Sequence, residues 1–325
     1  MFKKKLCILL CLILSLSACT NNANSTKQSS DSKQKVESSE SKDQKKEATN
    51  ETKAEDPKKD ESKKEDVKGE EAKVNLPQEN IMAVAWYQTS AEAKSLYQQG
   101  YNLAKAKLDE KIENNSSDKP IAIALDLDET VLDNSPSQAY LVVHNESYPK
   151  AWHEWIEYAK AEPVYGAKEF LDYADSKGVE IFYISDRSHD KDFDATKRNL
   201  EYAKIPLQGD DHLMLKKEGV KDKIARRNAV EEKYNLAMLF GDNLLDFDNP
   251  AEKTLESREA FVKEHAADFG DKYIVFPNPM YGSWEGTLYN NDFKKPAEEK
   301  HDLRFAALKI YNPETNSLET YQPSK

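Results

Sequence analysis

Cysteine is almost absent from this sequence, and the little there is lies at the very start. Of 325 residues three are cysteines, Cys7, Cys11 and Cys19. A disulfide framework and a thiol nucleophile are therefore excluded for the rest of the chain. The six histidines show neither an Arg-His-Gly run nor the paired spacing of a zinc site, and no glycine-rich phosphate loop occurs.

An excess of positive charge is also lacking. The formal net charge is −12, and a surface of that sign repels nucleic acid unless a local basic groove overrides it. We therefore expect no polymeric nucleic acid among the partners.

Long hydrophobic runs are missing as well. The apolar run from Leu6 to Leu16 is too short to span a bilayer comfortably. It follows three lysines and precedes small residues, which is the layout of an export signal. The letters "LSAC" at 16–19 resemble the bacterial lipobox, which predicts a signal peptide over 1–18 and a lipid such as palmitate on Cys19. The alternative is an ordinary secreted protein whose signal ends near a cysteine.

Residues 19–75 consist almost entirely of Ser, Lys, Glu, Asp, Asn and Gln. Such a segment cannot bury enough apolar surface to offset chain entropy, and both signs of charge are mixed throughout it. We expect a disordered tether that holds a folded domain, residues 76–325, near the outer face of the bacterial cell membrane.

Within that domain, short apolar runs alternate with amphipathic stretches. The apolar runs are 121–125, 179–185, 236–242 and 273–277, and the amphipathic ones are 166–177, 194–204, 223–234 and 257–269. Alternating strands and helices predict an α/β fold with a doubly wound parallel sheet. Two more helical patterns, around 89–112 and 148–161, lie outside the alternation. They suggest a small helical subdomain built from about 76–115 and 135–165.

Polar residues follow three of the predicted strands: Asp126 and Asp128 the first, Ser185, Asp186 and Arg187 the second, and Asp242, Asn243 and Asp246 the third. In open α/β sheets, ligands bind beyond the carboxyl ends of the strands. Carboxylates that meet at one edge repel each other unless a cation holds them, and all-oxygen ligands favour Mg²⁺ over zinc. One such aspartate alone is more often a loop residue or helix cap, but three strand ends together favour a magnesium site.

Four segments in this order resemble the motifs of the haloacid dehalogenase superfamily: "DLDET" (126–130), "YISDR" (183–187), a lysine near "VKDKIARR" (220–227) and "GDNLLDF" (241–247). "DLDETVLDNS", "GDNLLDF", "YGSWEG" (281–286) and the lipobox together resemble the class C nonspecific acid phosphatases, which are bacterial surface lipoproteins. The resemblance covers most of the region predicted to fold.

The resemblance implies a role for each motif. Asp126 would be the nucleophile that carries an aspartyl phosphate, and Asp128 would be the general acid and base. Mg²⁺ would be bound by the side chains of Asp126 and Asp242 and by the main-chain carbonyl of Asp128. Asp246 would orient the waters of the metal. Ser185 would bind a phosphate oxygen.

The resemblance also implies a lysine that neutralises the phosphate. The family pattern places it just before an arginine in the helix that leads to the third strand, which favours Lys223 over Lys221. Asp186 departs from the family, which often has asparagine there. Its charge would weaken phosphate binding unless the side chain points away or pairs with Arg187, a candidate substrate-binding residue.

Substrate choice is expected in the helical subdomain. Matches to the family at Trp152 and Tyr281 imply an aromatic slot for a nucleobase or another flat leaving group, which suits nucleoside 5′-monophosphates. Ordinary core packing is the competing interpretation for both, and the favoured one for Trp155.

The sequence thus predicts a Mg²⁺-dependent acid phosphatase that hydrolyses phosphomonoesters outside the cell, anchored to the membrane through Cys19. A sugar phosphate or vitamin phosphate as substrate stays open, as does a homodimer. The alternative from another class is a non-catalytic ligand-binding or adhesion lipoprotein, which would be expected to have lost Asp126 or Asp128.

Overall fold

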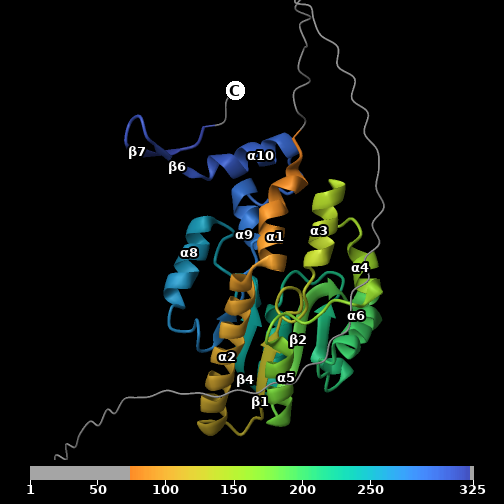
Figure 1. Ribbon diagram of the computed structural model, residues 1–325. Coiled ribbons are helices and arrows are strands. Elements are labelled where there is room, and N and C mark those ends of the chain that lie inside the picture. Colours follow the sequence, from red (N-terminus) through yellow and green to blue (C-terminus); the bar gives the residue numbers. More distant parts are fainter. Residues whose placement is uncertain (1–73, 323–325) are drawn as a thin grey trace, which may run out of the picture. The chain divides into compact units, whose positions relative to one another are not determined.

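The computed structural model describes residues 74–322 (Figure 1). The expected signal peptide, Cys19 and nearly all of the expected tether lie outside the described residues. Between residues 74 and 322, no helix combines the length and the apolar character needed to cross a membrane.

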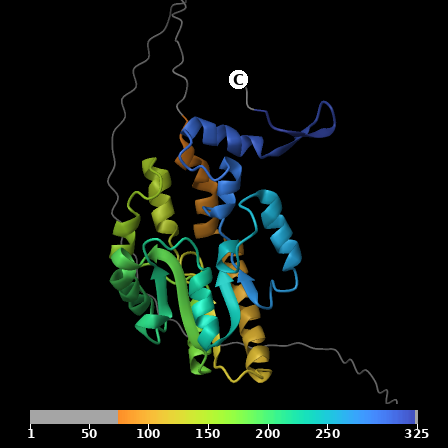
Figure 2. The same cartoon turned by 180° about the vertical axis from the view of Figure 1, so that it is seen from behind.

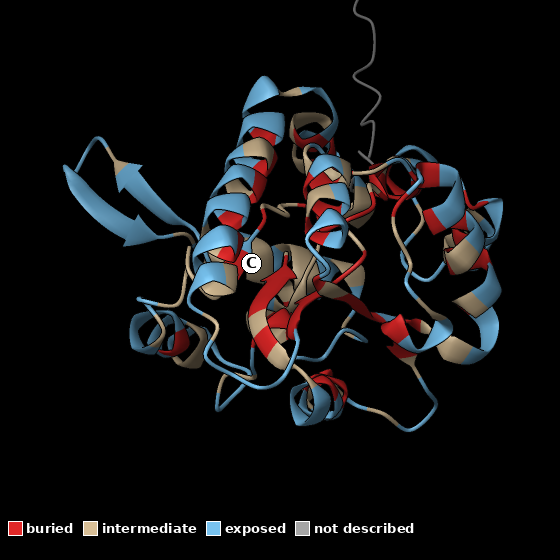
Figure 3. Cartoon of the chain, turned by 90° about the horizontal axis from the view of Figure 1, so that it is seen from below, coloured by how far each residue is buried: buried red, intermediate tan, exposed pale blue. Residues whose placement is uncertain are grey.

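A parallel sheet of five strands forms the centre of the domain, in the order β3-β2-β1-β4-β5. The strands are β1 (Ile121–Leu125), β2 (Glu180–Ser188), β3 (Leu213–Lys216), β4 (Asn235–Gly241) and β5 (Tyr273–Val275). All residues of β1 are buried, as Figure 3 shows for the middle of the sheet. The strand pairs in parallel with β2 on one side and β4 on the other. The predicted α/β fold is confirmed.

Helices cover both faces of the sheet, which explains why the strands have few polar residues. Ile123 and Leu125 of β1 pack in one apolar cluster with residues of α2 (Ala91–Glu113), α5 (Ala167–Ser176) and α6 (His189–Ala203). Ala122 and Ala124 face the other side, in a second cluster with α7 (Ile224–Lys233) and α8 (Leu255–Glu264). Figures 1 and 2 show the two faces in turn.

The helical patterns outside the alternation have different places in the fold. α2 packs along α5 and against β4 and β5, so it belongs to the layer that covers one face of the sheet. α1 (Ile81–Thr89) packs against α3 (Ser135–His144), and α4 (Trp152–Tyr158) packs against α6. In Figure 1, α1 and α3 stand beyond the end of the sheet.

The C-terminal part of the chain follows β5. It contains α9 (Ser283–Gly286), α10 (Ala297–Ala306) and an antiparallel hairpin of β6 (Lys309–Asn312) and β7 (Ser317–Thr320). Short 3-10 helices occur at η1 (Leu76–Asn80), η2 (Asp210–His212), η3 (Leu244–Asp246) and η4 (Thr287–Tyr289). Arg304 of α10 forms salt bridges with Glu79 in η1 at 2.9 Å and with Glu285 in α9 at 2.6 Å. The first of these connects the N-terminal and C-terminal parts of the domain.

Several parts of the fold, among them β3, α10 and the β6–β7 hairpin, were not predicted from the sequence. β3 is an edge strand of four residues in which buried and half-buried side chains alternate, and its apolar run is only three residues long. The β6–β7 hairpin is exposed along nearly its whole length, and Figure 3 shows it projecting from the domain.

Candidate active site

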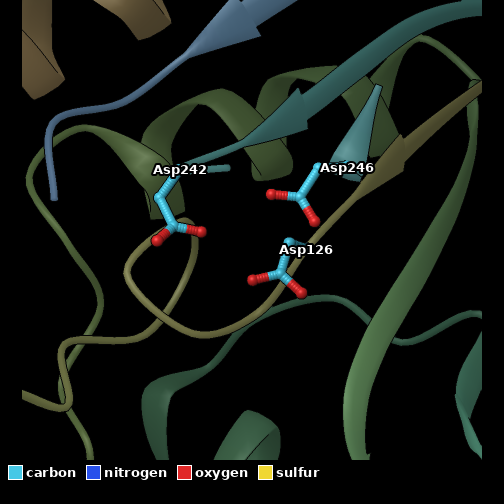
Figure 4. Close-up of side chains that lie close together, drawn as sticks. All are labelled: Asp126, Asp242 and Asp246. Atoms are coloured by element: carbon cyan, nitrogen blue, oxygen red, sulfur yellow. The ribbon is translucent and has the colours of Figure 1, made fainter. Parts of the chain in front are cut away.

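Three aspartates converge where the two central strands end. Asp126 follows β1, while Asp242 and Asp246 follow β4, the neighbour of β1 in the sheet. Each offers one carboxylate oxygen, and these oxygens lie within 4.8 Å of one another (Figure 4). The carboxyl ends of adjacent parallel strands meet at one edge, so residues far apart in the sequence form one acidic site.

Lys223 places a buried positive charge in this acidic site. Its side chain is 8% exposed, and its ammonium group donates to Asp126 Oδ1 and, at 2.6 Å, to Asp246 Oδ1. The residue immediately precedes α7, and its contacts with Asp126 and Asp246 place its ammonium group at the ends of β1 and β4. Lys221, the other candidate, is exposed.

The buried charges shift one another's pKa values. Burial raises the pKa of Asp126 well above its ordinary value; Lys223 opposes this, and the neighbouring aspartates add to it. Burial likewise raises the pKa of Asp242 to about 7, with Asp246 contributing. Burial disfavours the charged form of Lys223, but Asp126 and Asp246 outweigh it and raise its pKa. Without a further cation, the site therefore retains protons that ordinary aspartates would lose.

Hydrogen bonds fix the two aspartates that follow β4. Asn278 donates to Asp242 Oδ2 at 2.7 Å, and the main-chain N–H of Asn243 donates to Asp246 Oδ2 at 2.9 Å. Asp246 also packs directly on Gly241, where a Cβ atom would lie 2.2 Å from the Asp246 side chain. Only glycine leaves room for this carboxylate at the end of β4.

The side chain of Asp128 turns toward a different set of partners. Its Oδ1 accepts hydrogen bonds from Arg187 Nε (2.9 Å), Arg187 Nη2 (2.7 Å) and Asn134 Nδ2 (2.9 Å). Within the described part of the chain, its Oδ2 accepts one hydrogen bond, from Ser185 Oγ at 3.5 Å. Arg187, expected to touch substrate, is buried and serves as the main partner of Asp128.

The C-terminal end of β2 is held by an arginine that the sequence had not singled out. Arg226 donates to the carbonyl of Ser185 at 2.6 Å and to Asp186 Oδ1 at 2.7 Å. Burial disfavours the charged form of Asp186, yet Lys223, Arg226 and Lys216 outweigh it and lower its pKa. Asp186 is thus neutralised by Arg226 and Lys216, whereas Arg187 pairs with Asp128. The signal for Arg226 was its position three residues after Lys223, on the first turn of α7.

Comparison with known proteins decides the family. The sequence profile of "HAD superfamily, subfamily IIIB (Acid phosphatase)" matches residues 44–284. The structure of the class C acid phosphatase from Bacillus anthracis is 45% identical, with a TM-score of 0.71, and the match covers 74% of this chain and all of that one. The chain belongs to the class C acid phosphatases. A second structure of the Bacillus anthracis enzyme, with tungstate bound, matches with the same identity, coverage and TM-score.

This class C acid phosphatase is therefore a phosphoric monoester hydrolase, and its substrates are small phosphomonoesters. Phosphatases of the superfamily generally use a divalent metal, and the acidic site fits one. Its three carboxylates outnumber the single ammonium group of Lys223, and hard divalent cations prefer such oxygen ligands. The non-catalytic alternative is set aside by the family assignment.

Aromatic side chains of the class C acid phosphatase gather near Asp128. Trp152, half-buried, lies with its ring centroid 6.0 Å from the guanidinium carbon of Arg187. Tyr148, which the sequence analysis missed, has its ring centroid 6.2 Å from that of Trp152 and is 68% exposed. Its position four residues before Trp152 was the available signal.

The other two aromatic candidates, Trp155 and Tyr281, pack against the main apolar cluster. Trp155 packs against the main apolar cluster, and its indole N–H donates to Asn134 Oδ1 at 2.7 Å. Trp155 thus steadies the asparagine that holds Asp128. Tyr281 packs against the same cluster, and its buried hydroxyl finds no hydrogen-bond partner among residues 74–322.

Proposed function

We propose that this class C acid phosphatase is a Mg²⁺-dependent enzyme that hydrolyses nucleoside 5′-monophosphates through an aspartyl phosphate on Asp126, at the outer face of the cell membrane. The observation that carries the proposal is the convergence of Asp126, Asp242 and Asp246 around Lys223 at the ends of β1 and β4.

The cation would be held by the carboxylates of Asp126 and Asp242 and by the main-chain carbonyl of Asp128, with Asp246 beside them. When bound, Mg²⁺ neutralises the charge that otherwise keeps an anionic nucleophile away from an anionic phosphate. Lys223 contributes a second positive charge next to Asp126. Both charges favour the ionised carboxylate that nucleophilic attack requires.

In the first step, a carboxylate oxygen of Asp126 forms a bond to phosphorus as the bond from phosphorus to the ester oxygen breaks. The leaving oxygen takes a proton from Asp128. Asp128 Oδ1 is held by three donors from Arg187 and Asn134, so Oδ2 is the oxygen available to carry that proton.

In the second step, Asp128 accepts a proton from water, and the water oxygen forms a bond to phosphorus. The bond from phosphorus to Asp126 breaks, which releases inorganic phosphate and restores both carboxyl groups. Lys223 and the hydroxyl of Ser185 would stabilise charge on the phosphate oxygens in both steps.

An assay of the full-length chain tests this mechanism. Phosphate release from nucleoside 5′-monophosphates is expected with Mg²⁺ and not with a chelator. Asp126→Asn keeps the size of the side chain but removes the nucleophile, so turnover should fall at least about a thousandfold. Asp118→Asn, at an exposed position, is the matched control and should retain activity. Full turnover by Asp126→Asn would contradict the proposal that Asp126 is the nucleophile.

The proposed preference for nucleotides rests on the aromatic residues near the site. Trp152, half-buried beside Arg187, would supply one flat face on which a base can stack, and the family resemblance implies Tyr281 as the second. Stacking tolerates different bases. Trp152→Ala should raise KM for nucleoside 5′-monophosphates about tenfold, with little change for glycerol phosphate, which has no ring. An equal rise for both substrates would argue against a base-binding slot.

The proposed location rests on the lipobox at 16–19 and the charged segment that follows it. At the membrane surface, the enzyme would convert phosphomonoesters into uncharged nucleosides and free phosphate that the cell can import. Cys19→Ala should release the phosphatase from the membrane into the medium. Membrane retention of that variant would contradict the lipid anchor. The homodimer stays a prediction, tested by the mass of the protein in solution.

A further inference from the structure

The loop that carries Asp128 has an unusual backbone. Glu129 has a φ of 58°, which lies in the left-handed region that residues other than glycine rarely adopt. The carbonyl of Leu127 accepts from the N–H groups of Val131 and Leu132, both at 2.8 Å, and the N–H of Glu129 donates to Leu132 at 2.9 Å. Such a conformation persists only where the surroundings hold it in place.

Two tyrosines of α2, which lie outside the segment 126–130, form hydrogen bonds to the main chain of this loop. Tyr97 donates its hydroxyl proton to the carbonyl of Glu129, and Tyr101, one helical turn later, donates to the carbonyl of Thr130, both at 2.5 Å. Both side chains are buried, and burial raises the pKa of each phenol well above its ordinary value. The phenols therefore stay protonated and remain donors.

Neighbouring side chains fix the positions of both tyrosines. Tyr87 of α1 lies with its hydroxyl 2.7 Å from that of Tyr97, whose proton is already engaged by the loop, so Tyr87 is the donor in that contact. The ring of Phe276 stacks on Tyr97 with centroids 5.0 Å apart and lies 4.6 Å from that of Tyr101. Gly100 lets Phe276 approach α2 closely, since a Cβ atom there would lie 2.6 Å from the ring.

We propose that Tyr97 and Tyr101 are positioning residues for the metal site, acting through the main chain of the Asp128 loop. This inference rests on the proposed function. The carbonyl of Asp128 belongs to the peptide group before Glu129, and the φ of Glu129 sets its angle to the next peptide group. Tyr97 holds that next group by its carbonyl, and Tyr101 holds the one after it.

The tyrosines therefore link α2, which contributes no residue to the acidic site, to a main-chain oxygen proposed to bind the cation. Releasing the loop would let the Asp128 carbonyl rotate while the carboxylates of Asp126 and Asp242 stay in place. The expected consequence is weaker metal binding. Loss of residues that orient metal ligands commonly lowers metal affinity about ten- to a hundredfold.

The test compares Tyr97→Phe and Tyr101→Phe with Tyr183→Phe in the full-length chain. Tyr183 is a matched control, because its buried ring also donates a hydroxyl proton to a carbonyl, that of Pro206 at 2.7 Å. The Kd for Mg²⁺ is measured without substrate, from the rise in Tm with Mg²⁺ concentration and by titration calorimetry well below the Tm. Circular dichroism establishes that each variant is folded.

The proposal expects Tyr97→Phe to raise the Kd for Mg²⁺ about tenfold, Tyr101→Phe to raise it as well, and Tyr183→Phe to leave it unchanged while lowering the Tm. If all three variants lower the Tm but keep the wild-type Kd, the tyrosines are merely structural and the proposal is overturned. If the wild-type chain shows no response to Mg²⁺, the proposed metal dependence fails, and this inference fails with it.

Discussion

At the scale of single residues, Glu129 is a buried carboxyl group whose protonated form the site favours. Its side chain is fully buried, Oε1 accepts the N–H of Asn134 at 2.6 Å, and Oε2 has no partner among the described residues. Burial raises its pKa well above the ordinary value, and the charges of Asp128 and Asp242 act in the same direction. The protonated acid therefore resembles an amide in charge and shape.

Glu129→Gln should consequently keep its activity and Tm near the wild-type values at neutral pH. Glu129→Ala leaves a cavity and an unpaired N–H at Asn134, and should lower the free energy of unfolding by about 2 kcal/mol or more. Activity assays and thermal unfolding of both variants check this. A folded Glu129→Gln variant that loses most of its activity would show that the carboxyl group acts in its charged form.

At the scale of elements, the docking of α2 depends on Gly100. At an exposed helix position, alanine would stabilise the protein relative to glycine by about 1 kcal/mol. At Gly100 the new methyl group would collide with the ring of Phe276, so we expect the opposite sign, a loss of about 1–3 kcal/mol.

Denaturant unfolding of Gly100→Ala measures this loss of stability. Phe276→Leu in the same background supplies a smaller partner and should restore part of it. A Gly100→Ala variant more stable than the wild type would show that α2 can shift away from Phe276 without cost.

Sequence patterns predicted most elements because their signals are local. The apolar run at 121–125 coincides with β1, and the predicted helix at 223–234 matches α7 to within a residue at each end. β3 escaped prediction because its apolar run is only three residues long, which is too short to indicate a strand. The pattern of α2 predicted a helix, but its apolar face did not reveal which surface it would cover.

At the scale of the whole molecule, the buried acids make stability depend on pH. The pKa values of Asp126 and Glu129 are raised well above normal, and that of Asp242 is about 7. As the pH rises above about 4, the unfolded chain releases protons that the metal-free folded protein retains. The free energy of unfolding of the metal-free protein therefore falls as the pH rises toward 7.

Mg²⁺ should reverse this trend, because it competes with protons for the same carboxylates. The rise in Tm on adding Mg²⁺ is expected to be larger at pH 8 than at pH 5.5, values that bracket the Asp242 pKa of about 7. Thermal unfolding with chelator and with Mg²⁺ measures it, and NaCl of equal ionic strength controls for screening of surface charge. An equal Mg²⁺ effect at both pH values would contradict protonated carboxylates at this site.

The sequence by itself determined the strand and helix pattern, the order of the acidic motifs and hence the family. Each of these signals lies within a short stretch of chain, where residue spacing alone sets which side chains share a face or follow a strand. The tertiary structure decided the partners: Arg187 with Asp128, Arg226 with Asp186, and Tyr97 and Tyr101 with the Asp128 loop. Such contacts join residues far apart in the sequence, and only the packing of helices on the sheet brings them within hydrogen-bonding distance.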